Sequence, residues 1–295
     1  MANGIIVINK PQGWTSMDVC AKLRGIFREK RVGHAGTLDP MATGVLPVFL
    51  GRATRAVEFA SESQKEYIVG LKLGVITNTQ DTTGEVLEER PVDVTLDQLE
   101  SAMEQFRGDI EQIPPMYSAI KINGKKLYEL ARKGREVERK PRPVTIYAMT
   151  LEEQLSPDTF LLRVRCSKGT YMRTLCHDIG TVLGCGGTMC SLQRTMAAGF
   201  ELSQSVTLDQ VQQAEDPLSL LLSVDAYFAD RPAISLPPEE ERMVRNGMTL
   251  VRPDLTAGEY RVYGENEAFL ALCEAKKGKL FTVKSFFEPP EQTKK

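Results

Sequence analysis

Asp39 is the side chain in this sequence that is best placed to do chemistry. It lies between Leu38 and Pro40 in a glycine-rich stretch, GHAGTLDPMATG, at residues 33–44. The proline favours an extended backbone at Asp39, and the glycines permit the tight turns that present its carboxylate. A carboxylate is ordinarily ionised at neutral pH and therefore needs no general base to act as a nucleophile. The alternative is that Asp39 only stabilises its own turn.

Other catalytic designs find little support in the composition. The chain has only two histidines, His34 and His177, too few for a histidine metal site or a two-histidine acid–base pair. It contains neither the G-x-S-x-G motif of serine hydrolases nor the GxxxxGK[ST] motif of triphosphate-binding loops. Cys176, Cys185 and Cys190 lie near His177 but form no C-x-x-C pair, so we expect reduced thiols and no metal. No cofactor is predicted.

The segments around Asp39 predict the elements that position it. Residues 4–8 have strand character, and Ser16 is expected to cap a helix with one apolar face. Alternating apolar residues along 65–74 predict a half-buried strand that carries Tyr67. Later patterns predict strands at residues 117–122, 144–151 and 160–166, and helices at 126–133, at 172–182 and after the capping boxes at Thr95 and Thr207.

The length of 295 residues is comfortable for two domains. Three prolines between Asp230 and Pro238 suggest a linker, so we predict domains at residues 1–230 and 231–295. The expected fold class is α/β of the α+β type, with a mostly antiparallel mixed sheet flanked by helices and a small C-terminal β-barrel. Without an 18-residue apolar run or a signal-peptide pattern, the expected location is the cytoplasm.

Basic residues concentrate in one segment, although the formal net charge of the chain is −2. Between residues 121 and 142, nine lysines and arginines stand against three glutamates, a local charge of 9 − 3 = +6. Such a segment can contact nucleic acid phosphates, but a charge run taken alone is more often an ordinary solvated helix face.

The string GHAGTLDPMATGVLPV, together with NKPQGWTS before it, closely resembles the catalytic signature of the TruB family of tRNA pseudouridine synthases. The resemblance continues through KEY at residues 65–67, TNTQDTTG at 77–84 and CSKGTYMRTLCHDIG at 166–180, and it covers the chain from residue 4 to about 215. It implies that one uridine of tRNA, at position 55 in the T loop, is converted to pseudouridine without metal or cofactor.

The resemblance also implies roles for individual residues. Asp39 is the expected nucleophile, and Arg173 is its ion-pair partner. Tyr67 is the ring that stacks against the target base, and the strand pattern lets one face of that ring pack in the core while the other meets the base. The remaining residues expected to line the uridine site are His34, Tyr171 and Leu192. For His34, the alternative is that it merely orders the glycine-rich loop.

By the same resemblance, residues 117–143 form a thumb over the T stem-loop, which we call the thumb segment. Its expected phosphate contacts are Lys121, Lys125, Lys126, Arg132, Lys133 and Arg135. Residues 231–295 resemble a PUA-like domain.

Two other functions stay open from the sequence. The chain could be an RNA-binding or RNA-folding module with secondary or no catalysis, or a related synthase that needs a guide RNA and accessory proteins. The residues also do not decide whether Asp39 attacks C1′ of the ribose or acts as a base in a glycal route. We expect a monomer that binds the T stem-loop of tRNA.

Overall fold

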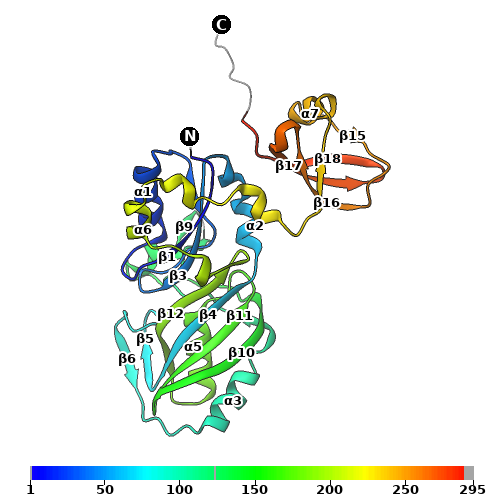
Figure 1. Ribbon diagram of the computed structural model, residues 1–295. Coiled ribbons are helices and arrows are strands. Elements are labelled where there is room, and N and C mark those ends of the chain that lie inside the picture. Colours follow the sequence, from blue (N-terminus) through cyan, green and yellow to red (C-terminus); the bar gives the residue numbers. More distant parts are fainter. Residues whose placement is uncertain (1, 123, 289–295) are drawn as a thin grey trace.

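The computed structural model describes residues 2–122 and 124–288. It has a long body built on one mixed sheet, with a smaller curled sheet at one end (Figure 1). The α/β fold class predicted from the sequence is confirmed. No helix in the described part of the chain is long and apolar enough to cross a membrane.

The main sheet places strands from distant parts of the chain side by side. Its order is β1–β3–β12–β4–β11–β10–β7, with β2 paired to β3 and β13 to β12. All neighbours pair antiparallel except β3 and β12, which run parallel. Its strands are β1 Gly4–Lys10, β2 Val32–His34, β3 Thr43–Leu50, β4 Lys65–Leu73, β7 Gly108–Gln112, β10 Arg142–Ser156, β11 Thr159–Cys166, β12 Gly187–Ala197 and β13 Phe200–Glu201.

The sequence patterns explain the central strands. Along β4 the residues Tyr67, Val69, Leu71 and Leu73 are all buried, as the alternation predicted. The apolar run at the start of β3 is buried along almost its whole length, because helices cover one face and a second apolar cluster covers the other.

Helices flank the sheet, and most of them begin at capping boxes. They are α1 Ser16–Phe27, α2 Val57–Glu62, α3 Leu96–Glu104, α5 Met172–Val182 and α6 Leu208–Gln213. Thr95 and Thr207 cap α3 and α6 as predicted. The prediction that Ser16 caps the first helix is wrong. Thr15 is the cap, with Asp18 completing its box, and this leaves the Ser16 hydroxyl free for another contact.

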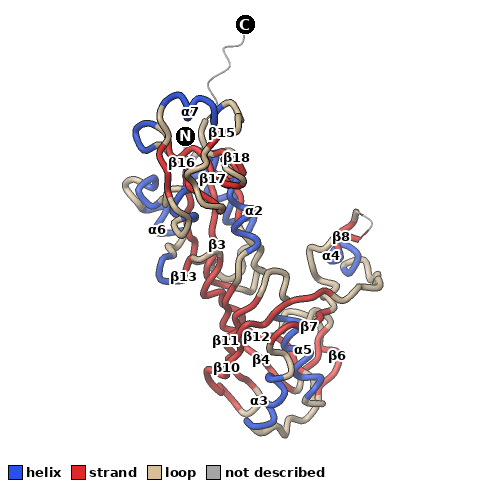
Figure 2. The backbone as a smooth tube through the Cα atoms, turned by 90° about the vertical axis from the view of Figure 1, so that its right-hand side faces the viewer, coloured by secondary structure: helices blue, strands red, loops and turns tan. Residues whose placement is uncertain are grey.

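The thumb segment stands away from the sheet (Figure 2). It contains β8 Lys121–Ile122, β9 Lys125–Lys126 and α4 Leu127–Ala131, and residue 123 between the strands lies outside the described residues. The strand expected at residues 117–122 is present only as β8, because the ladder to β9 extends over two residue pairs. The helix expected at residues 126–133 is present in its central part.

A second sheet follows residue 232 in the order β14–β16–β17–β18–β15. Its elements are β14 Ala233–Ser235, α7 Pro238–Arg245, β15 Leu250–Val251, β16 Gly258–Tyr263, β17 Phe269–Lys276 and β18 Lys279–Ser285. An apolar cluster that joins Phe49 and Phe228 to Leu272 and Phe286 packs this sheet against the main body. Because this cluster crosses residue 230, the domain boundary there stays a prediction.

The remaining elements are short. A hairpin of β5 Val75–Thr77 and β6 Val86–Glu89 lies beside the main sheet. The 3-10 helices are Gly51–Ala56, Leu202–Gln204, Pro217–Leu220, Val224–Phe228 and Glu265–Glu267.

A pair of helical glycines tests the packing of α5 on β12. A Cβ on Gly180 would come within 2.1 Å of the Gly187 backbone nitrogen, whereas Gly25 in α1 has open space around it. We expect Gly180→Ala to lower the free energy of unfolding by about 1–3 kcal/mol through overpacking. Gly25→Ala is the matched control and should raise it by about 0.5–1 kcal/mol, since alanine favours the helix. Urea unfolding measures both, and equal effects would contradict the close contact.

Candidate active site

The Asp39 loop, residues 35–42, connects β2 to β3 at the middle of the main sheet. Leu38 and Ala42 are buried and fix the loop from within, while the Asp39 side chain stays 37% exposed. Gly36 has φ +88°, a conformation that glycine adopts without strain. The loop therefore presents the carboxylate at the surface, as the sequence predicted.

Two buried polar side chains anchor this loop. The Ser16 hydroxyl accepts a hydrogen bond from the Leu38 N–H (2.9 Å) and lies 3.3 Å from the Leu38 carbonyl. The Lys10 ammonium is fully buried and donates to the carbonyls of Trp14 (2.7 Å) and Pro40 (3.4 Å). Both contacts immobilise the residues directly before and after Asp39.

The Asp39 carboxylate forms an ion pair with Arg173. The distance from Arg173 Nε to Asp39 Oδ2 is 3.1 Å. The two side chains differ in burial, because Arg173 is only 7% exposed. A guanidinium in a poorly solvated position holds the carboxylate oxygen in one place and leaves the other oxygen available.

The Arg173 guanidinium is itself held from several sides. It donates to the carbonyls of Thr79 (3.3 Å) and Tyr117 (2.8 Å), and its Nη1 lies 3.8 Å from the buried Asp81 carboxylate. Arg173 lies in the first turn of α5, just after Tyr171, whose backbone N–H donates to the Gln112 side chain. The position of Arg173 thus depends on the loop at residues 77–84, on the thumb segment and on β7.

Tyr67 lies on β4, and Leu192 lies on the neighbouring strand β12. Tyr67 is 7% exposed and Leu192 is 9% exposed, and both belong to the main core cluster. Burial raises the pKa of the Tyr67 hydroxyl, and the charge of Arg194 opposes that shift. Most of the Tyr67 ring packs in the core, so only its remaining edge is open to a base.

His34 and Tyr171 are both half-buried. Burial lowers the pKa of His34, and the neighbouring Arg194 lowers it further, so its imidazole is neutral at pH 7. The buried Nδ1 of His34 has no hydrogen-bond partner among the described residues. Burial raises the pKa of the Tyr171 hydroxyl.

The basic residues of the thumb segment are mostly free of ion pairs. Lys121, Lys125, Arg132, Lys133 and Arg135 are exposed, and no ion pair involves them in the described part of the chain. The Lys126 ammonium and the Arg132 guanidinium lie 5.3 Å and 5.4 Å from the centre of the Tyr128 ring. Arg139 is engaged in an ion pair with Glu136. Together with Lys140 and Arg142, seven exposed cations of the thumb segment are without an ion pair in the described part of the chain.

The cysteines and acidic residues give no sign of a metal centre. No group of three potential ligands is close enough to hold an ion within residues 2–122 and 124–288. The six cysteines are free thiols, and burial raises the pKa of Cys166 and of Cys20 to about 11. A thiol with a raised pKa is a poor nucleophile at neutral pH.

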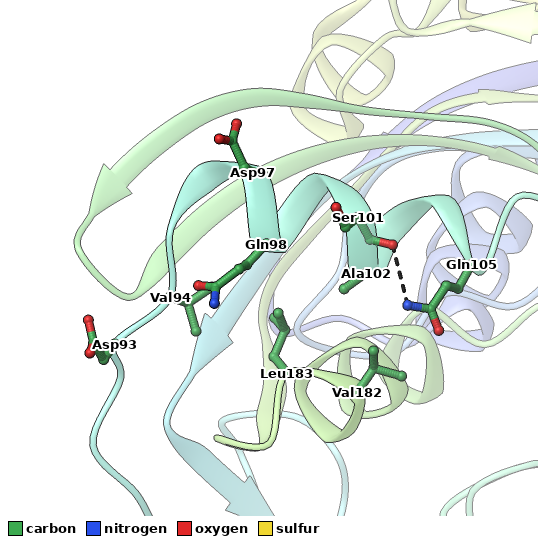
Figure 3. Close-up of a pocket in the computed structure, with 9 residues that line it drawn as sticks. All are labelled: Asp93, Val94, Asp97, Gln98, Ser101, Ala102, Gln105, Val182 and Leu183. Carbon is green, nitrogen blue, oxygen red and sulfur yellow. Dashed lines mark hydrogen bonds between the residues drawn. The ribbon is translucent and has the colours of Figure 1, made fainter.

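A pocket between α3 and the end of α5 lies apart from this site (Figure 3). It contains none of the residues discussed above, and aspartates lie along its rim, which would repel RNA phosphates. Its lining residues are Asp93, Val94, Asp97, Gln98, Ser101, Ala102, Gln105, Val182 and Leu183.

Several residues of the site were not identified from the sequence. The sequence predicts Ser16 only as a helix cap. Lys10 and Asp81 lie within the motifs NKPQGWTS and TNTQDTTG, but no individual role is predicted for them. Gln112 and Arg194 carried no signal in the sequence, because their contacts depend on pairing between distant strands.

Family models and curated relatives match this chain over most of its length. Residues 24–172 match the model described as TruB family pseudouridylate synthase (N terminal domain), and residues 173–226 match the tRNA pseudouridylate synthase B C-terminal domain. The chain is 44% identical to tRNA pseudouridine synthase B of Francisella philomiragia, over 96% of this chain and 95% of the relative. Identity to the same-named protein of Francisella tularensis subsp. novicida is 42% with equal coverage.

Solved structures share the fold. A chain in the structure of an H/ACA RNP bound to a substrate RNA containing 2′-deoxyuridine is 24% identical with a TM-score of 0.73, over 98% of this chain and 86% of that one. A chain of the archaeal box H/ACA sRNP Nop10-Cbf5 complex is 25% identical with a TM-score of 0.72, and the match covers 98% of this chain and 87% of that one.

The role of the buried Lys10 in anchoring the Asp39 loop can be tested by the pH dependence of the free energy of unfolding. Burial lowers the pKa of Lys10 from an ordinary 10.5 to about 8, although the charge of Asp39 acts in the opposite direction. Between these values the unfolded lysine holds a proton that the folded one has lost, so this residue makes stability rise with pH, by up to about 1.4 kcal/mol per pH unit. We expect the free energy of unfolding of the Lys10→Met variant to lack this contribution.

Urea unfolding of wild type and variant at intervals from pH 7 to pH 10.5 measures the difference. Subtracting one series from the other removes the cysteines and tyrosines that titrate in the same range. A constant difference across this range would contradict the lowered pKa of Lys10.

Proposed function

The chain belongs to the TruB family of pseudouridylate synthases, and on this basis we propose that it isomerises uridine 55 in the T loop of tRNA, with Asp39 as the nucleophile. We infer that tRNA is the substrate because the relatives are named tRNA pseudouridine synthase B. The proposal takes the chain to act as a monomer in the cytoplasm, as expected from the sequence.

The single observation that carries the proposal is the ion pair between Asp39 and Arg173. A carboxylate that is 37% exposed and held at 3.1 Å by a buried guanidinium is charged, aimed and accessible. A carboxylate that only stabilised its own turn would not require a buried cation from a strand–turn–helix more than a hundred residues away.

The isomerisation needs no group from outside the chain. In the nucleophilic route, an Asp39 oxygen bonds to C1′ while the C1′–N1 bond breaks and its electron pair leaves with the uracil. The uracil turns, C5 bonds to C1′ and displaces the carboxylate, C5 loses its proton, and N1 gains one. In the glycal route, Asp39 instead removes the C2′ proton while the C1′–N1 bond breaks, which leaves a C1′–C2′ double bond. C5 of the turned uracil then bonds to C1′ as Asp39 returns the proton to C2′, C5 loses its proton, and N1 gains one.

The target uridine must leave its stack before Asp39 can reach the ribose. Tyr67 and Leu192 belong to the apolar core on neighbouring strands, and Tyr171 directly precedes the helix that carries Arg173; we propose that these three side chains contact the displaced uridine. His34 is neutral and half-buried, so its proposed role is to occupy space near the displaced nucleotide rather than to transfer a proton.

The second candidate function is RNA binding or folding with secondary or no catalysis, since a charged thumb segment grips RNA even when the chemistry is absent. A third is a synthase that depends on a guide RNA, because the structural relatives come from H/ACA complexes. The higher identity to tRNA pseudouridine synthase B favours the proposal over both.

The Asp39→Asn variant separates catalysis from binding. The amide keeps the shape of the loop but lacks the charge that attacks the ribose, so we expect pseudouridine formation to be lost. Binding of tRNA should stay close to the wild-type value. Carbodiimide derivatisation of a tRNA transcript measures the product at base resolution, and filter retention measures the binding.

Three outcomes would count against the proposal. If Asp39→Asn lost binding together with activity, Asp39 would be a structural residue. If the purified wild-type chain left a bare T-arm stem-loop unmodified until other proteins or RNAs were added, the guide-dependent reading would replace it. A product at a uridine other than 55 would refute the assigned site.

The thumb segment predicts a salt-dependent contribution to RNA affinity. In the triple variant Lys121→Ala, Lys125→Ala, Lys133→Ala, the plot of log K against log salt concentration should become shallower by about 2–3, since each lost phosphate contact removes about 0.7–0.9 from the slope. Filter retention between low and moderate salt gives this slope. The matched control carries arginine at the same three positions and should keep it, and an unchanged slope in the alanine variant would exclude these contacts.

A further inference from the structure

Arg194 is a fully buried arginine in the centre of the main sheet. It lies on β12, where it is paired with Gly44 of β3 on one side and with Tyr67 of β4 on the other. The three strands run side by side in Figure 1. Arg194 therefore lies level with both the end of the Asp39 loop and the proposed stacking ring.

The Arg194 guanidinium connects the start of the Asp39 loop to β3, the strand that follows the loop. Its Nε donates to the Val45 carbonyl (2.7 Å), and its Nη2 donates to the Gly36 carbonyl (3.1 Å). Asp39 lies between these two carbonyls in the sequence. The approach is close, because a Cβ on Gly36 would come within 3.3 Å of Nη1, and one on Gly44 within 2.2 Å of the Arg194 carbonyl.

The same guanidinium acts on Tyr67. Its charge opposes the effect of burial, which is the larger cause, on the pKa of the Tyr67 hydroxyl, and the backbone of Arg194 pairs with that of Tyr67 in the sheet. One residue thus holds the loop that carries the nucleophile and lies beside the residue proposed to meet the base. The distance between these two groups depends on where Arg194 holds them.

Burying a cation at this position costs hydration free energy, which lowers the stability of the fold unless other contacts offset it. No carboxylate within residues 2–122 and 124–288 forms an ion pair with Arg194. Burial is the main reason that the pKa of Lys10 and that of Lys65 each fall to about 8, and the nearby charge of Arg194 acts in the same direction on both. Apolar residues of similar volume usually serve stability at least as well as buried ions. Packing alone therefore does not account for a guanidinium at this position.

We propose that Arg194 is a positioning residue for the reaction, which fixes the Asp39 loop at Gly36 and Val45 and sets its distance from Tyr67. This inference rests on the proposed function. Arg194 touches neither RNA nor the reacting atoms, and it acts through the backbone of the loop and through the Tyr67 hydroxyl.

The test is the Arg194→Lys variant of the whole chain. Lysine keeps the charge but places a single ammonium where the planar guanidinium spans two carbonyls. At saturating tRNA we expect the single-turnover rate to fall by about 10- to 100-fold, as displacements of roughly 1 Å do in active sites. The affinity for tRNA, measured by filter retention, should change by no more than about twofold, since the thumb segment supplies most of the phosphate contacts.

Arg107→Lys is the matched control. Arg107 also donates through its guanidinium to a backbone carbonyl, that of Met149 on β10, but it makes no contact with the Asp39 loop or Tyr67. Its variant should lose stability in thermal melts and keep the single-turnover rate. Arg194→Met would remove the charge and both hydrogen bonds to the Gly36 and Val45 carbonyls, and if this variant does not fold, the comparison of the two lysine variants still decides.

Two results would overturn the inference. One is an Arg194→Lys variant with the wild-type rate. The other is a variant whose rate and affinity for tRNA fall in the same proportion, which would make Arg194 a purely structural residue. If the wild-type chain formed no pseudouridine at all, the proposed function would fail first, and this result is distinct from both.

Discussion

The contact on which the candidate site depends is the ion pair between a half-exposed carboxylate and an almost fully buried guanidinium. Arg173 cannot turn towards water, because the Thr79 and Tyr117 carbonyls and the Asp81 carboxylate hold it from the protein side. Asp39 must therefore come to Arg173, and its loop is anchored where that contact forms. Because Arg173 is buried and Asp39 is partly exposed, the arginine stays in one place and the aspartate carboxylate is the group that faces solvent.

The main sheet allows this contact because it joins strands that are far apart in the sequence. The parallel pairing of β3 with β12 brings the end of the Asp39 loop beside a strand that begins near residue 187. α5 precedes that strand and packs against it through Gly180 and Gly187, so Arg173 enters the site from the start of a helix whose place is set by β12. The sheet, the helix and the loop thus constrain one another at the same point.

Much of this architecture could be predicted from the sequence. Alternation along β4 and capping boxes at Thr95 and Thr207 are local patterns, and the elements follow them. The Asp39 loop was identified from its glycines and proline. Ser16 was wrongly assigned because the neighbouring Thr15 has the same capping chemistry, and the choice between them depends on Leu38, 22 residues later. Arg194 and Gln112 were missed for the same reason, since their partners are set by strand pairing and leave no local pattern.

Charge segregation explains how a chain with a net charge of −2 can serve an anionic substrate. The exposed cations of the thumb segment have no ion-pair partners in the described part of the chain, whereas Arg163 on β11 and Arg252 just after β15 are paired with carboxylates. Under the proposed function, long-range attraction to RNA would come mainly from the part of the molecule that stands away from the sheet (Figure 2). The buried cations Lys10, Lys65 and Arg194 do not face solvent. The proposals thus give RNA capture and loop positioning to two separate sets of basic residues, and either set can be changed without removing the other.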